Sequence, residues 1–147
     1  MFFCDNPVYY DRLKMEPVKI VIRYFDGRLF KGYTSDFFPN KPLFHVRPVE
    51  SEFSDKGIEV HVVELKAVFF VKDFTGNSAH RELNQFTGGQ LPGRKVEVTF
   101  VDGEIIVGTT LGYDPTRPGF FVTPADPESN NLRAFVISTA VSNFRYL

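Results

Sequence analysis

The 147-residue chain has one cysteine and no tryptophan, and its charges nearly cancel. A lone Cys4 cannot form an intramolecular disulfide, so the sequence gives no indication of an oxidising compartment. The 17 basic and 18 acidic residues leave a net charge of −1, which argues against DNA binding through a general positive field. We therefore expect neither a disulfide framework nor a DNA-binding protein.

Sequence signals of catalysis, metal binding and membranes are also missing. The histidines, His45, His61 and His80, stand 16 and 19 residues apart, outside any CxxC or HExxH pattern. No apolar run approaches the roughly 18 residues of a membrane span, and the opening residues lack the basic region of a secretory signal. We expect no catalytic residue, cofactor or metal, and a cytoplasmic protein without membrane association.

The clearest positive feature is an internal repeat. Residues 18–48 and 94–124 match at a constant offset of 76 positions. Further on, an Ala-Val dipeptide recurs at an offset of 73, which predicts a loop three residues shorter in the second copy. The pattern indicates a tandem duplication. The matched residues mostly set backbone geometry: Asp26-Gly27 with Asp102-Gly103, Gly32 with Gly108, Pro39 with Pro115, and Pro48 with Pro124.

Each copy is predicted to form five short strands. Residues 18–24 and 94–100 alternate with a period of two, which is typical of half-buried strands. The Asp-Gly that follows each of them is a strong hairpin signal, so Asp26 and Asp102 are interpreted as turn residues and not as catalytic carboxylates. Five bent strands in about 55 residues favour a small barrel.

The predicted fold class is therefore mainly β, with two tandem five-stranded barrels. The predicted organisation is an N-terminal segment over residues 1–16, a first barrel over 17–74, a linker over 75–93 and a second barrel over 94–147. A loose capping pattern predicts one or two helical turns within residues 78–86 of the linker. A short helix is also expected within residues 1–16.

The order of strand, Asp-Gly, strand with a central glycine, loop and strand resembles the small barrels of the SH3 and Sm-like type. The segments GYDPTRPGFFVTPADPESNNLRAFVISTAV and AVFFVKDFTGN resemble a family of uncharacterised bacterial domains, which occur singly, in tandem or beside signalling modules. The resemblance covers residues 17–147 and implies a fold without a particular activity. Sm-like proteins bind RNA partly through a basic residue followed by glycine between the last strands, and residues 138–140 contain no such pair.

The candidate partner-binding residues belong to a Pro-x-basic-Pro loop that occurs in both copies. They are Phe37 and Lys41 in the first copy, and Tyr113 and Arg117 in the second. Prolines three residues apart restrict the loop conformation, and aromatic and arginine side chains are enriched at binding hot spots. In the alternative interpretation, the prolines only shape the turn, the aromatic ring covers the barrel and the cation is solvated.

Together these patterns predict a non-enzymatic protein-interaction or regulatory module of the bacterial cytoplasm. An unidentified protein is the expected partner, and a homo-oligomer is compatible with the sequence. The alternative is an Sm-like protein that binds single-stranded RNA. The 17 phenylalanines leave one open question. Five of them, at loop or outward-facing positions, either are buried between the barrels or form an apolar patch for a partner: Phe37, Phe38, Phe69, Phe70 and Phe121.

Overall fold

The computed structural model describes residues 16–50, 57–76, 79–89 and 91–147. The helix expected near the N-terminus falls within residues 1–15, outside these ranges. Residues 79–86 of the linker lie in turns and irregular structure, so the helical turns predicted there are wrong. Within the described ranges, no helix has the length and apolar character needed to cross a lipid bilayer.

The described chain is mainly β, as the sequence predicts. Two 3-10 helices, η1 (Val62–Glu64) and η2 (Ser138–Ala140), each precede the last strand of one half of the chain. The first half has the strands β1 (Val18–Tyr24), β2 (Leu29–Thr34), β3 (Leu43–Pro48), β4 (Ile58–His61) and β5 (Leu65–Val71). The second half has β6 (Arg94–Phe100), β7 (Ile105–Thr110), β8 (Gly119–Pro124), β9 (Asn131–Ile137) and β10 (Val141–Tyr146).

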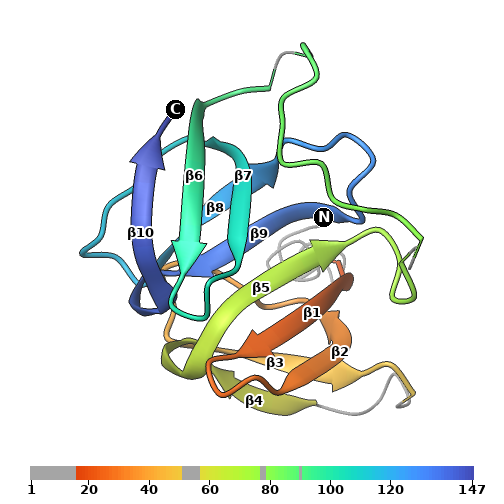
Figure 1. The fold of residues 1–147 in the computed structure, drawn as a ribbon. Helices are drawn as coiled ribbons and strands as arrows, with labels where there is room; N and C mark the ends of the chain where they lie inside the picture. Colours follow the sequence, from red (N-terminus) through yellow and green to blue (C-terminus); the bar gives the residue numbers. More distant parts are fainter. Residues whose placement is uncertain (1–15, 51–56, 77–78, 90) are drawn as a thin grey trace, which may run out of the picture.

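All ten strands belong to one open antiparallel sheet. Its order is β10-β6-β7-β8-β9-β5-β1-β2-β3-β4, and Figure 1 shows β9 and β5 side by side at the centre. Each half contributes five neighbouring strands in the same internal order, with its last strand first. The hydrogen bonding runs continuously through both halves, and does not by itself mark out two barrels.

The strand registers of the two halves repeat at one offset. Ile20 of β1 lies opposite Phe70 of β5, and Val96 of β6 lies opposite Tyr146 of β10, each 76 positions later. The pairs β3–β4 and β8–β9 are related by the same offset. The predicted change to 73 is therefore wrong. The two Ala-Val dipeptides that suggested it are not equivalent, because one lies within β5 and the other spans the end of η2 and the start of β10.

Glycines allow the tight geometry of each half. Gly27 and Gly103 have φ values of 97° and 92° in the two Asp-Gly hairpins, a conformation that other residues rarely adopt. Gly32 and Gly108 lie within β2 and β7, where a Cβ atom would overlap a carbonyl oxygen of β3 or β8. The backbones of neighbouring strands therefore approach closely at these two positions.

The two halves share their hydrophobic cores through β5 and β9. Val68 and Phe70 of β5 belong to the core of the first half, whereas Phe69 of the same strand belongs to the core of the second. In β9, Phe135 packs in the first core and Val136 in the second. Since every residue of β5 is buried, this strand is covered on both faces.

This arrangement answers the question of the surplus phenylalanines. Phe37, Phe69 and Phe70 are buried, and Phe121 is half-buried and packs against the first core. The Phe37 ring makes edge contacts with Phe44 and Phe70 of its own half, and with Phe121 and Phe135 of the second half. Most of these rings therefore fill the junction between the halves and do not form an exposed patch.

Candidate binding groove

A groove of about 550 Å³ opens on the second half. The end of β7, the loop that follows it, β8 and β9 form most of its lining. Pro39 of the first half and Pro92 of the linker complete it. The groove therefore lies beside the junction of the two halves, where segments distant in sequence meet.

One wall of the groove is apolar and aromatic. Tyr113 stacks on Phe144 with ring centroids 3.7 Å apart and also contacts the edge of Phe120. These contacts fix the half-buried tyrosine ring in place. Leu111 is 86% exposed at the same groove, which leaves apolar surface available to a partner.

The Pro-x-basic-Pro loop is held by its own hydrogen bonds. The Asp114 carboxylate accepts hydrogen bonds from the hydroxyl and the backbone N–H of Thr116, at 2.6 and 2.9 Å. These bonds, with the nearby Arg117, lower the pKa of Asp114 below its ordinary value. The Arg117 Nε atom lies 3.7 Å from Asp114, with three-quarters of its side chain exposed. The loop thus presents Arg117 to solvent from an ordered turn.

A second arginine, Arg133 of β9, lines the same groove. Its guanidinium carbon lies 4.2 Å from the ring centroid of Phe121 and 4.6 Å from that of Phe70. Partial burial among these groups lowers the pKa of Arg133 from its ordinary value, although an arginine keeps its charge at neutral pH. Sequence patterns give no sign of this residue, because an arginine in a predicted strand is typical of a solvated side chain.

Thr109 of β7 also lines the groove. The residue is 3% exposed, and its hydroxyl oxygen is buried without a hydrogen-bond partner among the described residues. A buried polar atom of this kind is costly to leave unpaired. It therefore marks a polar position in the lining that the described residues leave unpaired.

The corresponding loop of the first half is built differently. Phe37 occupies the position equivalent to Tyr113 but is only 2% exposed, so its ring has little surface with which to contact a partner directly. Its ring is needed in the core, where Phe44 and Phe135 lie 5.0 and 5.1 Å away. Lys41 is exposed beside Phe38 and does not line the groove. Of the four predicted residues, the structure brings only Tyr113 and Arg117 together.

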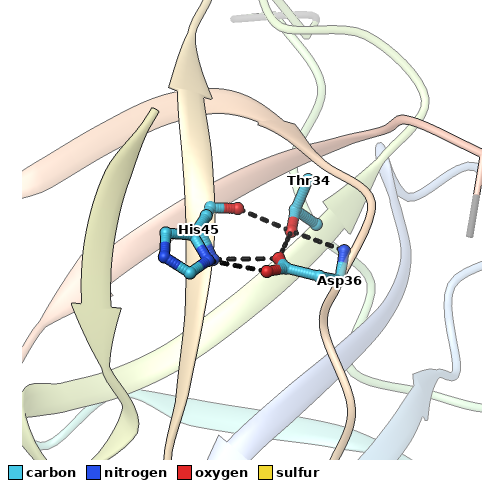
Figure 2. Close-up of polar contacts among 3 residues, drawn as sticks. All are labelled: Thr34, Asp36 and His45. Carbon is cyan, nitrogen blue, oxygen red and sulfur yellow. Dashed lines mark hydrogen bonds and ion pairs between the residues drawn. The ribbon is translucent and has the colours of Figure 1, made fainter. Parts of the chain in front are cut away.

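A polar cluster in the first half, shown in Figure 2, joins Thr34, Asp36 and His45. The Asp36 carboxylate accepts a hydrogen bond from the His45 backbone N–H at 2.9 Å and lies 2.7 Å from Nδ1 of its ring. Partial burial alone would raise the pKa of Asp36, but the hydrogen bonds from His45 outweigh it and the pKa is lowered. The Thr34 hydroxyl contacts Asp36 and donates a hydrogen bond to the His45 carbonyl. Because it does not contact the His45 imidazole, Thr34 and His45 do not form a nucleophile–base pair.

The equivalent threonine of the second half supports a structural role for this cluster. Thr110 donates a hydrogen bond to the carbonyl of Phe121 at 2.7 Å, as Thr34 does to the carbonyl of His45. The positions of Asp36 and His45 are occupied by Gly112 and Phe121. The threonine bond therefore fixes the loop in both halves, and the Asp–His contact is an addition of the first.

A second polar cluster connects the linker to the loop before β9. His80, Glu82 and Asp126 each bring one ligand-type atom within 4.8 Å of the others. Asp126 accepts hydrogen bonds from the Leu83 and Glu128 backbone N–H groups, both at 2.8 Å, and lies 2.7 Å from Nε2 of His80. These partners, the Leu83 N–H first, lower the pKa of Asp126. Since they use both of its carboxylate oxygens, we interpret the cluster as an anchor for the linker.

Comparison with known proteins places the chain in a family but not in a functional class. A family model described as a family of unknown function, DUF6982, matches residues 16–147. The chain belongs to this family. No curated protein and no solved structure matches it. The DUF6982 match spans both halves of the sheet, and so includes every residue of the groove and of the two polar clusters described above.

Proposed function

We propose that this DUF6982 chain is a non-enzymatic protein-interaction module, and that its groove receives an extended segment of a protein partner. The groove carries this proposal, because it combines a fixed aromatic ring, an exposed leucine and two arginines on an ordered frame. Tyrosine and arginine are enriched among the residues that supply most of the energy at protein interfaces, and binding pockets are lined mainly by apolar and aromatic side chains. A bacterial cytoplasmic setting is part of the same proposal.

The proposal includes an interpretation of the fold. We regard each half as one SH3/Sm-like unit of a tandem duplication, linked edge to edge by β5 and β9. The identical strand order, the single register offset and the 3-10 helix before each last strand support this interpretation. On this view the groove arises where two units of one chain meet, and neither unit alone has its full lining.

Site-specific photo-crosslinking tests the proposed function. A photoreactive amino acid at Leu111 should capture a discrete protein in a lysate of the source cells, whereas the same group at Val101 should not. Val101 is a suitable control because it is 53% exposed in the β6–β7 hairpin and does not line the groove. Capture should fall when Arg117→Ala is added, and should be unaffected by Lys41→Ala at the equivalent position. Equal capture from both labelled positions would contradict the proposal.

Single-stranded RNA is the alternative occupant, and it is distinguished in a parallel experiment. Random single-stranded RNA at low salt should not be retarded by the wild-type chain in a native gel. Retardation that is lost in Arg117→Ala and weakens steeply with salt would instead assign the groove to RNA.

A further inference from the structure

The side chain of Arg133 is exposed, and its guanidinium group lies over the faces of Phe70 and Phe121. Within residues 16–50, 57–76, 79–89 and 91–147 it has no carboxylate or other acceptor as a partner. An aromatic face attracts the cation but accepts none of its five N–H donors in the plane of the fork. The in-plane N–H donors are therefore left open to an anion.

The groove offers a second polar group near its apolar wall. The buried hydroxyl of Thr109 has no hydrogen-bond partner among the described residues, and it lines the groove together with Arg133. Two independent observations, an unpaired cation and an unpaired buried hydroxyl, thus mark the same cavity. Both would be satisfied by one ligand that carries oxygen atoms.

The charge of the groove favours a single negative charge on that ligand. Asp114 is itself part of the lining, and its lowered pKa keeps it ionised at neutral pH. The Asp114 carboxylate would repel a doubly charged phosphate. A ligand with a single carboxylate needs only one guanidinium group as its partner. Leu111 and Tyr113 add apolar surface beside the polar groups.

We propose that the groove recognises a carboxylate next to an apolar side chain in a partner peptide, with Arg133 as the principal donor and Thr109 as a second polar contact. This inference rests on the proposed function and names the chemistry of its ligand. The carboxylate can come from the C-terminus of the peptide or from an acidic side chain, because the two groups have the same geometry.

A small probe tests the chemistry without a known partner. We expect 3-phenylpropionate, titrated into the isotope-labelled full chain and followed by NMR, to shift the resonances of groove residues. The neutral 3-phenylpropionamide should bind at least about tenfold more weakly, because hydrogen bonds to a charged group are among the strongest. Inorganic phosphate should also bind more weakly. Equal binding of the acid and the amide would overturn the proposal.

Variants assign the interaction to individual residues. Arg133→Gln should weaken 3-phenylpropionate binding about tenfold, Arg133→Lys should have an intermediate effect, and Lys41→Gln should have none. Thr109→Val should weaken binding by a smaller factor than Arg133→Gln, because valine keeps the shape of the threonine side chain and removes only its hydroxyl. Thermal unfolding checks that each variant is folded. If both Arg133 variants failed to fold, the comparison of acid and amide on the wild-type chain would decide alone.

Peptides distinguish the two sources of the carboxylate. A peptide ending in phenylalanine is compared with its C-terminal amide, and an amidated peptide containing Glu-Phe is compared with one containing Gln-Phe. A loss of binding on amidation assigns the site to a chain terminus, and a loss on replacing Glu by Gln assigns it to a side chain. Binding that is indifferent to both changes would overturn the proposal.

The two proposals fail in different ways. If crosslinking from Leu111 persisted unchanged in Arg133→Gln, the groove would still bind a protein, but without a carboxylate contact. If 3-phenylpropionate bound through Arg133 while Leu111 captured no protein, the anion site would stand and the peptide partner would be wrong.

Discussion

The ammonium nitrogen of Lys66 lies 2.7 Å from a carboxylate oxygen of Asp102, across the boundary between the two halves. Lys66 belongs to β5, and only 8% of its side chain is exposed. The same ammonium group contacts Glu104 and lies 4.6 Å from the ring centroid of Phe100. The Lys66 ammonium group of the first half therefore binds the β6–β7 hairpin of the second half.

A double-mutant cycle measures this contact. With Lys66→Met and Asp102→Asn, we expect a coupling of about 1 kcal/mol in the free energy of unfolding, because the cation is buried while its partner is half-exposed. Urea unfolding of the four proteins gives the value. The matched control is the exposed pair Asp114–Arg117, for which the coupling should be smaller because water and salt screen both charges. Equal couplings at the two pairs would contradict the role of Lys66.

The same contact predicts a pH dependence. Hydrogen bonds from the Lys66 ammonium and from the Glu104 backbone N–H lower the pKa of Asp102 below its ordinary value of 3.8. The ionised Asp102 carboxylate therefore makes its full contribution to stability at pH values above its ordinary pKa. This contribution is lost as the pH falls through the lowered pKa of the folded chain. The difference in stability between wild type and Lys66→Met should shrink below about pH 4. A constant difference from pH 6 to pH 2 in urea unfolding would exclude this linkage.

The burial of Phe37 predicts that removing its ring will strongly destabilise the fold. Because its ring contacts four other phenylalanines at the junction, Phe37→Ala should reduce the free energy of unfolding by about 3–5 kcal/mol. Leu111→Ala, at an exposed position, should change it by less than about 0.5 kcal/mol. Urea unfolding monitored by circular dichroism compares them. A small effect of Phe37→Ala would mean that the ring is not part of a packed core.

Replacing two glycines of the second half by alanine should have very different effects on the free energy of unfolding. A Cβ atom at Gly108 would overlap the Thr123 carbonyl, so Gly108→Ala should cost about 3 kcal/mol or prevent folding. At Gly112 no described heavy atom lies within 4 Å of the added carbon, and its effect should remain within about 0.5 kcal/mol. Thermal unfolding of the two variants is sufficient to compare them. Similar melting temperatures would contradict the close approach of β7 and β8.

The local features of the fold were predictable from the sequence, because each depends on a few neighbouring residues. Period-two alternation located β1 and β6, and the Asp-Gly pairs located the hairpins at Gly27 and Gly103. The pairing of β5 with β9 was not predicted, although the apolar run of β5 is typical of a strand covered on both faces. Strand pairing between distant segments depends on the shape of both surfaces, which no local pattern records.

The candidate site was predictable only in part, for a related reason. The repeat identified the loop with Tyr113 and Arg117, but it could not distinguish that loop from its counterpart, where the same motif buries Phe37. Arg133 was missed because its role depends on Phe70 of the other half. Equivalent positions of the two halves share backbone geometry, whereas their surroundings differ where the halves touch.

The pairing of β5 with β9 also has a consequence for how the fold responds to dilution. Separate units that met through these strands would dissociate at low concentration, whereas one polypeptide keeps the two strands at a high effective concentration. The connection between them passes through the linker, which His80 and Asp126 attach to the loop before β9. After cleavage of the linker, the pairing of the two halves would depend on protein concentration. The groove would then be complete only at concentrations at which the halves remain associated.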